Sequence, residues 1–411
     1  MKHRVVVTGY GLASPIGMSV ADFERNLFAG KSGVRDIRGQ LVPKDFPVPY
    51  AAWIRRDELP PSRLYARPER ALKSWLMTEH AAREALRGLD PEHGLDAVVY
   101  GTADGVSYEI ANEVMRDGPQ GFETAAFCSE SSLYAIRDLA ETLGFGVLDD
   151  RKLICINSAC ASGNQAIGIA FEGIRDGRWS RCLAGGVDAR CEPSNFLNFF
   201  HLGALTTADL PPEKASRPFS KDRSGFVRGE GAAALVLESE ASARARGATI
   251  LGYVEGYGCT SDAFRLTDGR DDGSSVVEAI RRAVTSAGLG AEAIDYINAH
   301  GTSTPLNDRL ETLAIKQVFG ERARSIPVSS LKSQIGHSTI ASSALEAIAC
   351  LLMLQRQRVS PTLNCDVPDP ECDLDYVPNV SRDHALKHVL SNSFGFGGQN
   401  TCLVLGKADP S

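Results

Sequence analysis

Cys160 has the sequence surroundings of a nucleophile. It follows an apolar and β-branched run, 153–157, that predicts a buried strand, and it precedes a helical pattern over 165–176. A thiol near the start of a helix lies in the field of the helix dipole, which favours the thiolate and raises its nucleophilicity. Small Ala, Ser and Gly neighbours leave room for a carbonyl group to approach the sulfur. An inert buried cysteine is the alternative.

Two of the eight histidines also stand directly after strand patterns. His300 lies in Asn-Ala-His-Gly-Thr-Ser-Thr, and His337 lies at the entrance to a helix. Neutral imidazole can donate a hydrogen bond to a developing oxyanion or enolate, and it can accept a proton. Lys332 and Glu346 flank His337 and could form a buried pair that fixes its orientation and tautomer. Structural histidines and a surface salt bridge are the alternatives.

The segment 392–398, Asn-Ser-Phe-Gly-Phe-Gly-Gly, is a glycine-rich loop between two strand patterns. It is not a phosphate loop, because no Gly-Lys-Ser/Thr follows and no helix opens after it. Its backbone N–H groups could complete an oxyanion hole with the amide of Cys160. Phe396, between two glycines, could swing as a gate, although a plain tight turn is the alternative.

The composition excludes several classes of protein. With 43% hydrophobic and 23% charged residues, the 411-residue chain has the make-up of a globular protein, and a net charge of −7 argues against nucleic acid or an anionic membrane as its main partner. Ten cysteines without CxxC pairs predict no metal site and no disulfide framework. The first residues run straight into a strand pattern, and no apolar run reaches about 18 residues. We therefore expect no signal peptide, no membrane span and a cytoplasmic location.

Strand and helix patterns alternate along the chain, as in α/β proteins. Segments of the first half resemble segments of the second in the same order: 5–11 and 253–258, 96–102 and 295–302, the surroundings of Cys160 and 326–355, and 182–186 and 389–393. This order predicts a duplicated α/β fold with halves 1–245 and 246–411. Ligands in such sheets bind beyond the carboxyl ends of the strands. One pocket could therefore gather Cys160, His300, His337 and the loop 394–398.

These motifs resemble those of the β-ketoacyl-acyl carrier protein synthases, in particular the synthase II type and the ketosynthases of type II polyketide systems. The resemblance covers nearly the whole chain and includes further motifs at 7–11, 184–188, 216–219 and 229–231. It implies the thiolase fold, a duplicated five-layered α-β-α-β-α unit with pseudo-twofold symmetry. It also implies an acyltransferase that acts as a homodimer or as a heterodimer with a chain-length-factor-like paralogue.

The resemblance implies a decarboxylative Claisen condensation without a metal or redox cofactor. Cys160 would take an acyl group from a phosphopantetheine arm, and the amides of Cys160 and Phe396 would stabilise the oxyanion. His300 and His337 would bind the thioester carbonyl of malonyl-carrier protein as carbon dioxide leaves. Lys332 and Glu346 would position His337. The further residues implied in substrate binding are Thr302, Thr304 and Phe394.

An acidic acyl carrier protein is the implied partner, which requires a basic docking patch. Arg63, Arg67, Arg70 and Lys73 recur at spacings of three to four residues and are expected on one face of a helical stretch. An ordinary solvated helix face is the alternative.

Some positions depart from the pattern of fatty acid synthases of this type. Ser-Thr-Ile-Ala-Ser-Ser-Ala follows His337 in place of a Gly/Ala-rich run, and Arg265 replaces a usual histidine. Asp104 stands where an apolar residue usually lines the acyl pocket, and a carboxylate there is costly unless a partner such as Arg265 offsets it. Fatty acid elongation and specialised polyketide or polyene synthesis are therefore both open.

Two other readings are the alternatives to a synthase. A thiolase acting on CoA thioesters has a second cysteine in the C-terminal glycine loop, whereas here no cysteine precedes Cys402 in that loop. A non-elongating partner subunit of a ketosynthase heterodimer lacks the nucleophile, whereas Cys160 is present. A synthase of the third type uses Cys-His-Asn, whereas this chain has His337.

Overall fold

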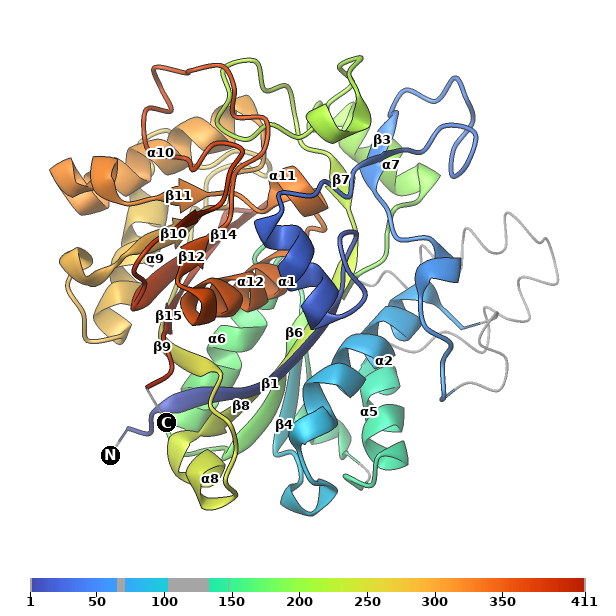
Figure 1. Cartoon of the computed structure of the whole chain (residues 1–411), viewed down its shortest axis with the longest axis vertical. Coiled ribbons are helices and arrows are strands. Elements are labelled where there is room, and N and C mark those ends of the chain that lie inside the picture. Colours follow the sequence, from blue (N-terminus) through green and yellow to red (C-terminus); the bar gives the residue numbers. More distant parts are fainter. Residues whose placement is uncertain (1, 65–70, 103–132, 147, 410–411) are drawn as a thin grey trace.

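The computed structural model describes residues 2–64, 71–102, 133–146 and 148–409 (Figure 1). Ten strands form its central sheet, five from each half of the chain. The first half supplies β1 (Val5–Ala13), β4 (Ala97–Thr102), β5 (Leu153–Ile156), β6 (Arg181–Asp188) and β8 (Gly231–Ser239). The second half supplies β9 (Gly252–Ser261), β10 (Tyr296–Asn298), β11 (Val328–Ser329), β14 (His388–Gly395) and β15 (Gln399–Gly406).

The strand order is symmetric about its centre. It runs β11-β10-β14-β15-β9-β1-β8-β6-β4-β5, so each strand of one half has a counterpart at the same distance from the β1–β9 pair. The two halves join where Val5–Val7 pair antiparallel with Gly252–Val254. The halves predicted from the sequence, 1–245 and 246–411, meet between α8 (Glu240–Ala245) and β9.

The halves also repeat a detail of hydrogen bonding. Oδ2 of Asp96 accepts the backbone N–H groups of Ser180 and Arg181 at 2.7 and 3.0 Å, where β6 begins. In the second half, Oδ2 of Asp295 accepts those of Lys387 and His388 at 2.7 and 3.0 Å, where β14 begins. The repeated arrangement supports the duplication that the sequence predicts.

Helices lie in three layers. α6 (Ser162–Arg175) and α12 (Ser342–Arg356) contact strands of both halves and form the middle layer. α2 (Lys73–Ala85) and α5 (Leu133–Thr142) cover the first half of the sheet from outside, and α9 (Ser274–Ser286) and α10 (Pro305–Phe319) cover the second. With the sheet halves between them, these helices form the five layers of the thiolase-like fold.

The remaining elements lie in connections between these layers. They are α1 (Val20–Phe28), α7 (Pro193–His201), α11 (Lys332–Ile335), β2 (Arg35–Asp36), β3 (Tyr50–Ala52), β7 (Arg228–Gly229), β12 (Arg358–Val359) and β13 (Arg382–Asp383). β2, β3 and β7 pair in a small separate sheet. Within the described ranges, no helix is long and apolar enough to cross a membrane.

The middle layer explains the composition of α12. A helix packed on all sides must be apolar on all sides, and residues 342–354 of α12 are all buried. β5 differs from its prediction, because it lies at the sheet edge and only Ile156 of its four residues is buried. Within the described part of the chain, β5 has a neighbouring strand on one side only. The apolar run in the sequence does not reveal that its other edge is unpaired.

Paired glycines set the distance between each half of the sheet and its outer helix. A Cβ atom on Gly11 of β1 would lie 2.3 Å from the carbonyl oxygen of Ala81 in α2. A Cβ atom on Gly258 of β9 would lie 2.1 Å from the carbonyl oxygen of Ala279 in α9. The sequence motif Gly-Tyr-Gly is therefore repeated because the same close approach occurs twice.

We predict that Gly11→Ala and Gly258→Ala each lower the free energy of unfolding by about 1–3 kcal/mol, because the new methyl group clashes with helix backbone that can move only at a cost in energy. Chemical denaturation measures the effect. Gly88→Ala is the matched control, since nothing lies within 4 Å of its added Cβ. Equal stabilities of Gly11→Ala and Gly88→Ala would contradict this account of the layers.

Candidate active site

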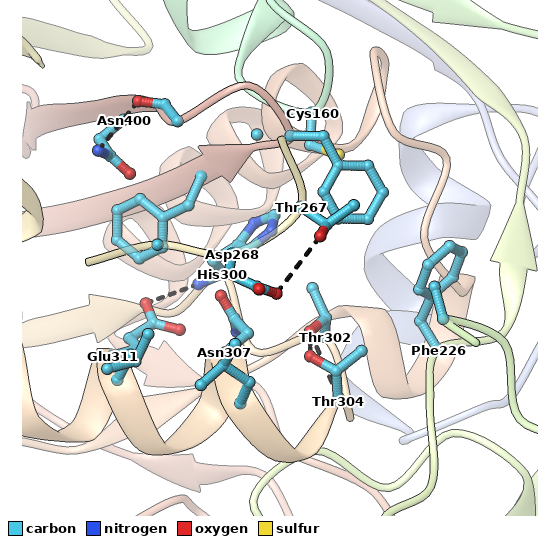
Figure 2. Close-up of a pocket in the computed structure, with 18 of the residues that line it drawn as sticks. Cys160, Phe226, Thr267, Asp268, His300, Thr302, Thr304, Asn307, Glu311 and Asn400 are labelled. Atoms are coloured by element: carbon cyan, nitrogen blue, oxygen red, sulfur yellow. Dashed lines mark hydrogen bonds between the residues drawn. The ribbon is translucent and has the colours of Figure 1, made fainter. Parts of the chain in front are cut away.

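One cavity of about 310 Å³ gathers the predicted chemistry (Figure 2). It lies where loops from both halves of the sheet meet, with Cys160 among its lining residues. The other sequence-predicted residues that line it are His300, His337, Thr302, Thr304, Phe394 and Phe396. The predicted meeting of both halves at one pocket is confirmed.

Cys160 lies in a tight turn between β5 and α6. The preceding Ala159 has φ 48°, a left-handed conformation that costs a non-glycine residue about 1–2 kcal/mol. The turn is held by Ser162, whose hydroxyl donates to the carbonyl of Ala159 at 2.6 Å and accepts the N–H of Ser158 at 2.9 Å. The hydroxyl of Ser393 donates to the carbonyl of Cys160 at 2.8 Å. Hydrogen bonds from both halves thus fix the strained turn.

The resting thiol of Cys160 is uncharged, contrary to the expectation from the helix dipole. Burial raises its pKa to about 11, although the charges of Lys332 and Arg228 and a hydrogen bond from the Phe396 backbone oppose the rise. The residue is only 4% exposed. The sequence showed the helix but not the depth of burial, so a base is needed to take the thiol proton.

His337 is placed to be that base. Its Nε2 lies 3.1 Å from Sγ of Cys160, and its Nδ1 lies 3.2 Å from the hydroxyl oxygen of Ser342. A hydroxyl can donate or accept, so Ser342 satisfies either neutral tautomer of the ring. His337 can therefore accept the thiol proton at Nε2 and can later donate from the same atom.

His300 faces the same space. Its ring centroid lies 5.3 Å from that of His337, with the rings inclined at 83°. Burial lowers the pKa of both histidines well below the usual range, and the charge of Lys332 lowers each further. Both imidazoles are therefore uncharged at neutral pH and can offer N–H groups to one carbonyl oxygen.

Lys332 and Glu346 form the buried pair that the sequence predicted. Nζ of Lys332 lies 2.5 Å from Oε1 of Glu346, and both side chains are almost fully enclosed. Among the described residues, no hydrogen bond joins Lys332 to either histidine, so its effect on them is through charge. The contact that orients His337 comes from Ser342, within the serine-rich run that the sequence marked as unusual.

The glycine loop brings the Phe396 amide to the thiol. A Cβ atom on Gly395 would lie 2.8 Å from the carbonyl oxygen of Ser158 and 3.1 Å from the backbone nitrogen of Cys160. Only glycine at position 395 therefore allows the loop to approach the Cys160 turn this closely. The backbone N–H of Phe396 bonds to the thiol. The Phe396 ring packs against Phe199 with centroids 6.2 Å apart.

Threonine hydroxyls line the cavity beside His300. The hydroxyl oxygens of Thr302 and Thr304 lie 2.8 Å apart (Figure 2). Phe394 also lies beside His300, with its ring centroid 5.5 Å from that of the imidazole. Both threonines that the resemblance implied in substrate binding thus line the cavity.

Glu311, which the sequence reasoning missed, holds the His300 turn. It accepts the backbone N–H groups of His300 and Gly301, each at 2.8 Å, and Nδ2 of Asn392 donates to it at 3.1 Å. Burial raises its pKa to about 7 against these donors. Its position eleven residues after His300 on a helix was the only sequence signal.

Arg265, a predicted substrate residue, is not among the residues that line the cavity. The structure does not support the predicted contact of Arg265, because its side chain is 63% exposed, lies 3.6 Å from Asp268 and stacks on Phe264. Its neighbours Thr267 and Asp268 line the cavity instead. Asp104 lies outside the described residues.

Of the four cations predicted to form a docking face, the structure describes Arg63 and Lys73. Lys73 begins α2 and its ammonium group pairs with the buried carboxylate of Glu230, so it is withdrawn from the surface. Arg63 is exposed but precedes the helix. Arg67 and Arg70 lie outside the described residues. Periodic spacing alone could not reveal that Glu230 takes up one of the four cations.

Comparison with known proteins identifies the family. Residues 152–243 match the model "Beta-ketoacyl synthase, N-terminal domain", and residues 251–366 match "Beta-ketoacyl synthase, C-terminal domain". The chain belongs to the β-ketoacyl synthase family. It acts as a β-ketoacyl-acyl carrier protein synthase, an acyltransferase of fatty acid or type II polyketide biosynthesis.

Relatives of both pathways are similar over the full length. The chain is 36% identical to 3-oxoacyl-acyl-carrier-protein synthase 2 of Synechocystis sp., covering 99% of this chain and 98% of the relative. It is 37% identical to the tetracenomycin polyketide synthase ketoacyl synthase alpha subunit of Streptomyces glaucescens, covering 99% and 97%. These two similarities alone do not separate the pathways.

Solved structures support the fold. A ketosynthase in complex with its type II polyketide acyl-carrier protein and bound to a hexaketide superposes with a TM-score of 0.87 at 34% identity, covering 99% of this chain and 100% of that one. The ishigamide ketosynthase/chain length factor gives the same TM-score and identity, covering 100% of both chains.

We predict that alkylation of Cys160 by iodoacetamide rises with pH from about 7 to 10 without the plateau expected near an ordinary cysteine pKa of about 8.5. The reason is that only the thiolate reacts and burial keeps the thiol protonated. Peptide mass spectrometry isolates Cys160 from the other cysteines, and Cys160→Ala gives the blank. A plateau below about pH 8 would contradict the uncharged resting state.

We predict that Glu311→Gln lowers malonyl decarboxylation about tenfold or more, because the amide loses one acceptor and the His300 turn shifts. In the wild type the rate should rise through about pH 7, where Glu311 ionises and accepts its three donors, and the variant should lack this step. Glu278→Gln, at a half-exposed glutamate paired with Arg282, is the control. An unchanged pH profile in Glu311→Gln would refute the role.

Proposed function

We propose that this chain is the elongating ketosynthase of a type II polyketide pathway, with a chain-length-factor-like paralogue as its partner subunit. The observation that carries the condensation itself is the 3.1 Å contact between the Cys160 thiol and His337 Nε2, beside the second neutral histidine. The polyketide assignment is supported by full-length similarity to ketosynthases of such systems. It is also supported by the serine-rich run after His337.

The first step transfers the acyl group. His337 Nε2 accepts the thiol proton while Sγ of Cys160 forms a bond to the thioester carbonyl carbon. The amides of Cys160 and Phe396 stabilise the oxyanion. The bond to the pantetheine sulfur then breaks, and His337 returns the proton to that sulfur.

The second step makes the carbon–carbon bond. His300 donates an N–H group to the thioester carbonyl of the malonyl group, and so does His337 in the neutral tautomer that carries its proton on Nε2 while Ser342 donates to Nδ1. The bond from the malonyl group to its carboxylate breaks, which releases carbon dioxide and leaves an enolate. The enolate carbon attacks the acyl carbonyl, and the bond to Cys160 Sγ breaks. The departing thiolate regains one proton from solvent, which restores the resting thiol.

An acidic carrier protein fits the substrate path, since Thr302 and Thr304 offer hydroxyls to a pantetheine arm. One of the similar structures contains a carrier protein bound to its ketosynthase, and another is a ketosynthase with a chain length factor. Lys73, one of the four predicted docking cations, pairs with Glu230.

Reconstitution tests the proposal. We expect the purified chain, alone or with a chain-length-factor-like paralogue, to form an acyl adduct on Cys160 from acyl-carrier protein and to release carbon dioxide from malonyl-carrier protein. His300→Ala should keep the adduct but lose decarboxylation by about 100-fold or more, since it removes an electrostatic donor. Mass spectrometry and carbon dioxide release measure the two steps.

The variants separate the outcomes. Cys160→Ala should give no adduct, whereas Cys259→Ala, at a partly exposed free cysteine, should behave as the wild type. Full elongation of fatty acyl chains by the chain alone, with no gain from the paralogue, would overturn the polyketide assignment. An adduct on Cys160→Ala would overturn the nucleophile.

A further inference from the structure

Arg228 is fully buried, and its side chain is the largest of the fully buried side chains among the described residues. It lies in β7, immediately before Gly229. Its guanidinium donates four hydrogen bonds to four acceptors: Asn195 Oδ1 at 2.9 Å, Asp188 Oδ1 at 2.7 Å, Gly229 O at 2.9 Å and His337 O at 2.8 Å. A guanidinium so fully engaged has one orientation.

Arg228 and its neighbours clamp the backbone of His337. The N–H of His337 donates to the carbonyl of Val227 at 2.7 Å, and its carbonyl accepts the N–H of Gly229 at 3.0 Å. The same carbonyl accepts Nη1 of Arg228. The peptide groups of the base are thus fixed by 227–229, while Ser342 fixes its ring.

Asp188 anchors the clamp from the end of β6. It accepts from Arg228, from Arg190 at 2.8 Å and from the hydroxyl of Thr339, two residues after His337. Burial alone would raise the pKa of Asp188, but the two guanidinium groups hold it below the usual range. Asp188 is therefore an anion on β6 that holds Arg228, which binds the His337 carbonyl, and Thr339, which follows His337 in the chain.

The positive charge of the guanidinium also affects the pKa of the reactive thiol. The charge of Arg228 lowers the pKa of both Cys160 and His337, second in each case to that of Lys332 among the cations. The charged or titratable groups facing Cys160 are His337, Lys332, Arg228 and Asp188. Those facing His337 are Cys160, His300, Lys332, Arg228 and Asp188. Arg228 and Lys332 reach the pair from different elements.

We propose that Arg228 is a positioning residue of the condensation: its guanidinium, held by four hydrogen bonds, fixes the backbone of His337 opposite Cys160 and places a buried positive charge behind this pair. The proposal rests on the proposed roles of Cys160 and His337. It separates two contributions, the hydrogen bond to the His337 carbonyl and the positive charge, which two substitutions can divide.

The test compares Arg228→Gln, which removes the charge, with Arg228→Lys, which keeps the charge but loses the guanidinium fork. The alkylation rate of Cys160 by iodoacetamide as a function of pH reports the charge, and it needs no carrier protein. The rate of condensation reports the position of His337. Thermal denaturation reports the loss of stability from breaking a buried ion pair.

Arg246→Gln is the matched control. Glu238 is a buried carboxylate shared by Arg181 and Arg246, just as Asp188 is shared by Arg190 and Arg228. Glu238 lies on β8, where it pairs with Val6 of β1. Among the described residues, Glu238 makes no contact with residues of the cavity. This control therefore loses a comparable ion pair away from the thiol.

We expect Arg228→Gln to slow alkylation near neutral pH by about tenfold, which corresponds to one pKa unit, and to slow condensation by at least as much. Arg228→Lys should alkylate within about threefold of the wild type but condense about tenfold more slowly. Arg246→Gln should match the wild type in both assays.

Wild-type alkylation in Arg228→Gln would overturn the charge contribution, and wild-type condensation in Arg228→Lys would overturn the positioning. Equal losses in Arg246→Gln would show that the effect is general destabilisation and would also overturn the proposal. If Arg228→Gln does not fold, Arg228→Lys alone decides the positioning. If the wild type forms no acyl adduct, the proposed function fails, while alkylation still tests the charge.

Discussion

The contact between the first turns of α6 and α12 sets the geometry on which the site depends. A Cβ atom on Gly163 would lie 2.7 Å from the backbone nitrogen of Ala344 and from the hydroxyl oxygen of Ser343. That hydroxyl accepts the N–H of Asn164 at 2.9 Å. Because Cys160 lies just before α6 and His337 just before α12, this approach brings thiol and imidazole within hydrogen-bonding distance. A larger residue at position 163 would separate nucleophile and base.

Burial then decides the charge states. It keeps the thiol and both imidazoles neutral, so the reactive groups enter each step without a counterion to displace. The cations nearby are held in pairs, Lys332 with Glu346 and Arg228 with Asp188, which limits the cost of enclosing them. Their fields still reach the sulfur, because these charges are buried and solvent screens buried charges only weakly. The site is thus uncharged at its reacting atoms and charged one layer behind them.

Features carried by local motifs could be predicted from the sequence, and features set by distant contacts could not. Cys160, His300 and His337 stand in short motifs at strand ends, and the repeated Gly-Tyr-Gly indicated the duplication. The role of Lys73 depended on Glu230, far along the chain, and the exposure of Arg265 depended on how its loop folds outward. The thiol pKa went against the dipole argument, since burial outweighed it. Ser342 and Glu311 act through single hydrogen bonds that have no periodic signature.

The duplication also explains why the nucleophile and its base come from different halves. β5 and β11 occupy equivalent ends of the sheet, and each is connected to a helix of the middle layer, β5 by the short turn 157–161 and β11 by the longer segment 330–341, which contains α11. The turn after β5 carries Cys160, and the segment after β11 carries His337. These equivalent connections between strand and helix meet at one cavity, so one can carry the nucleophile and the other the base. Neither half alone holds a complete site, which makes the packing of α6 on α12 a requirement for catalysis as well as for stability.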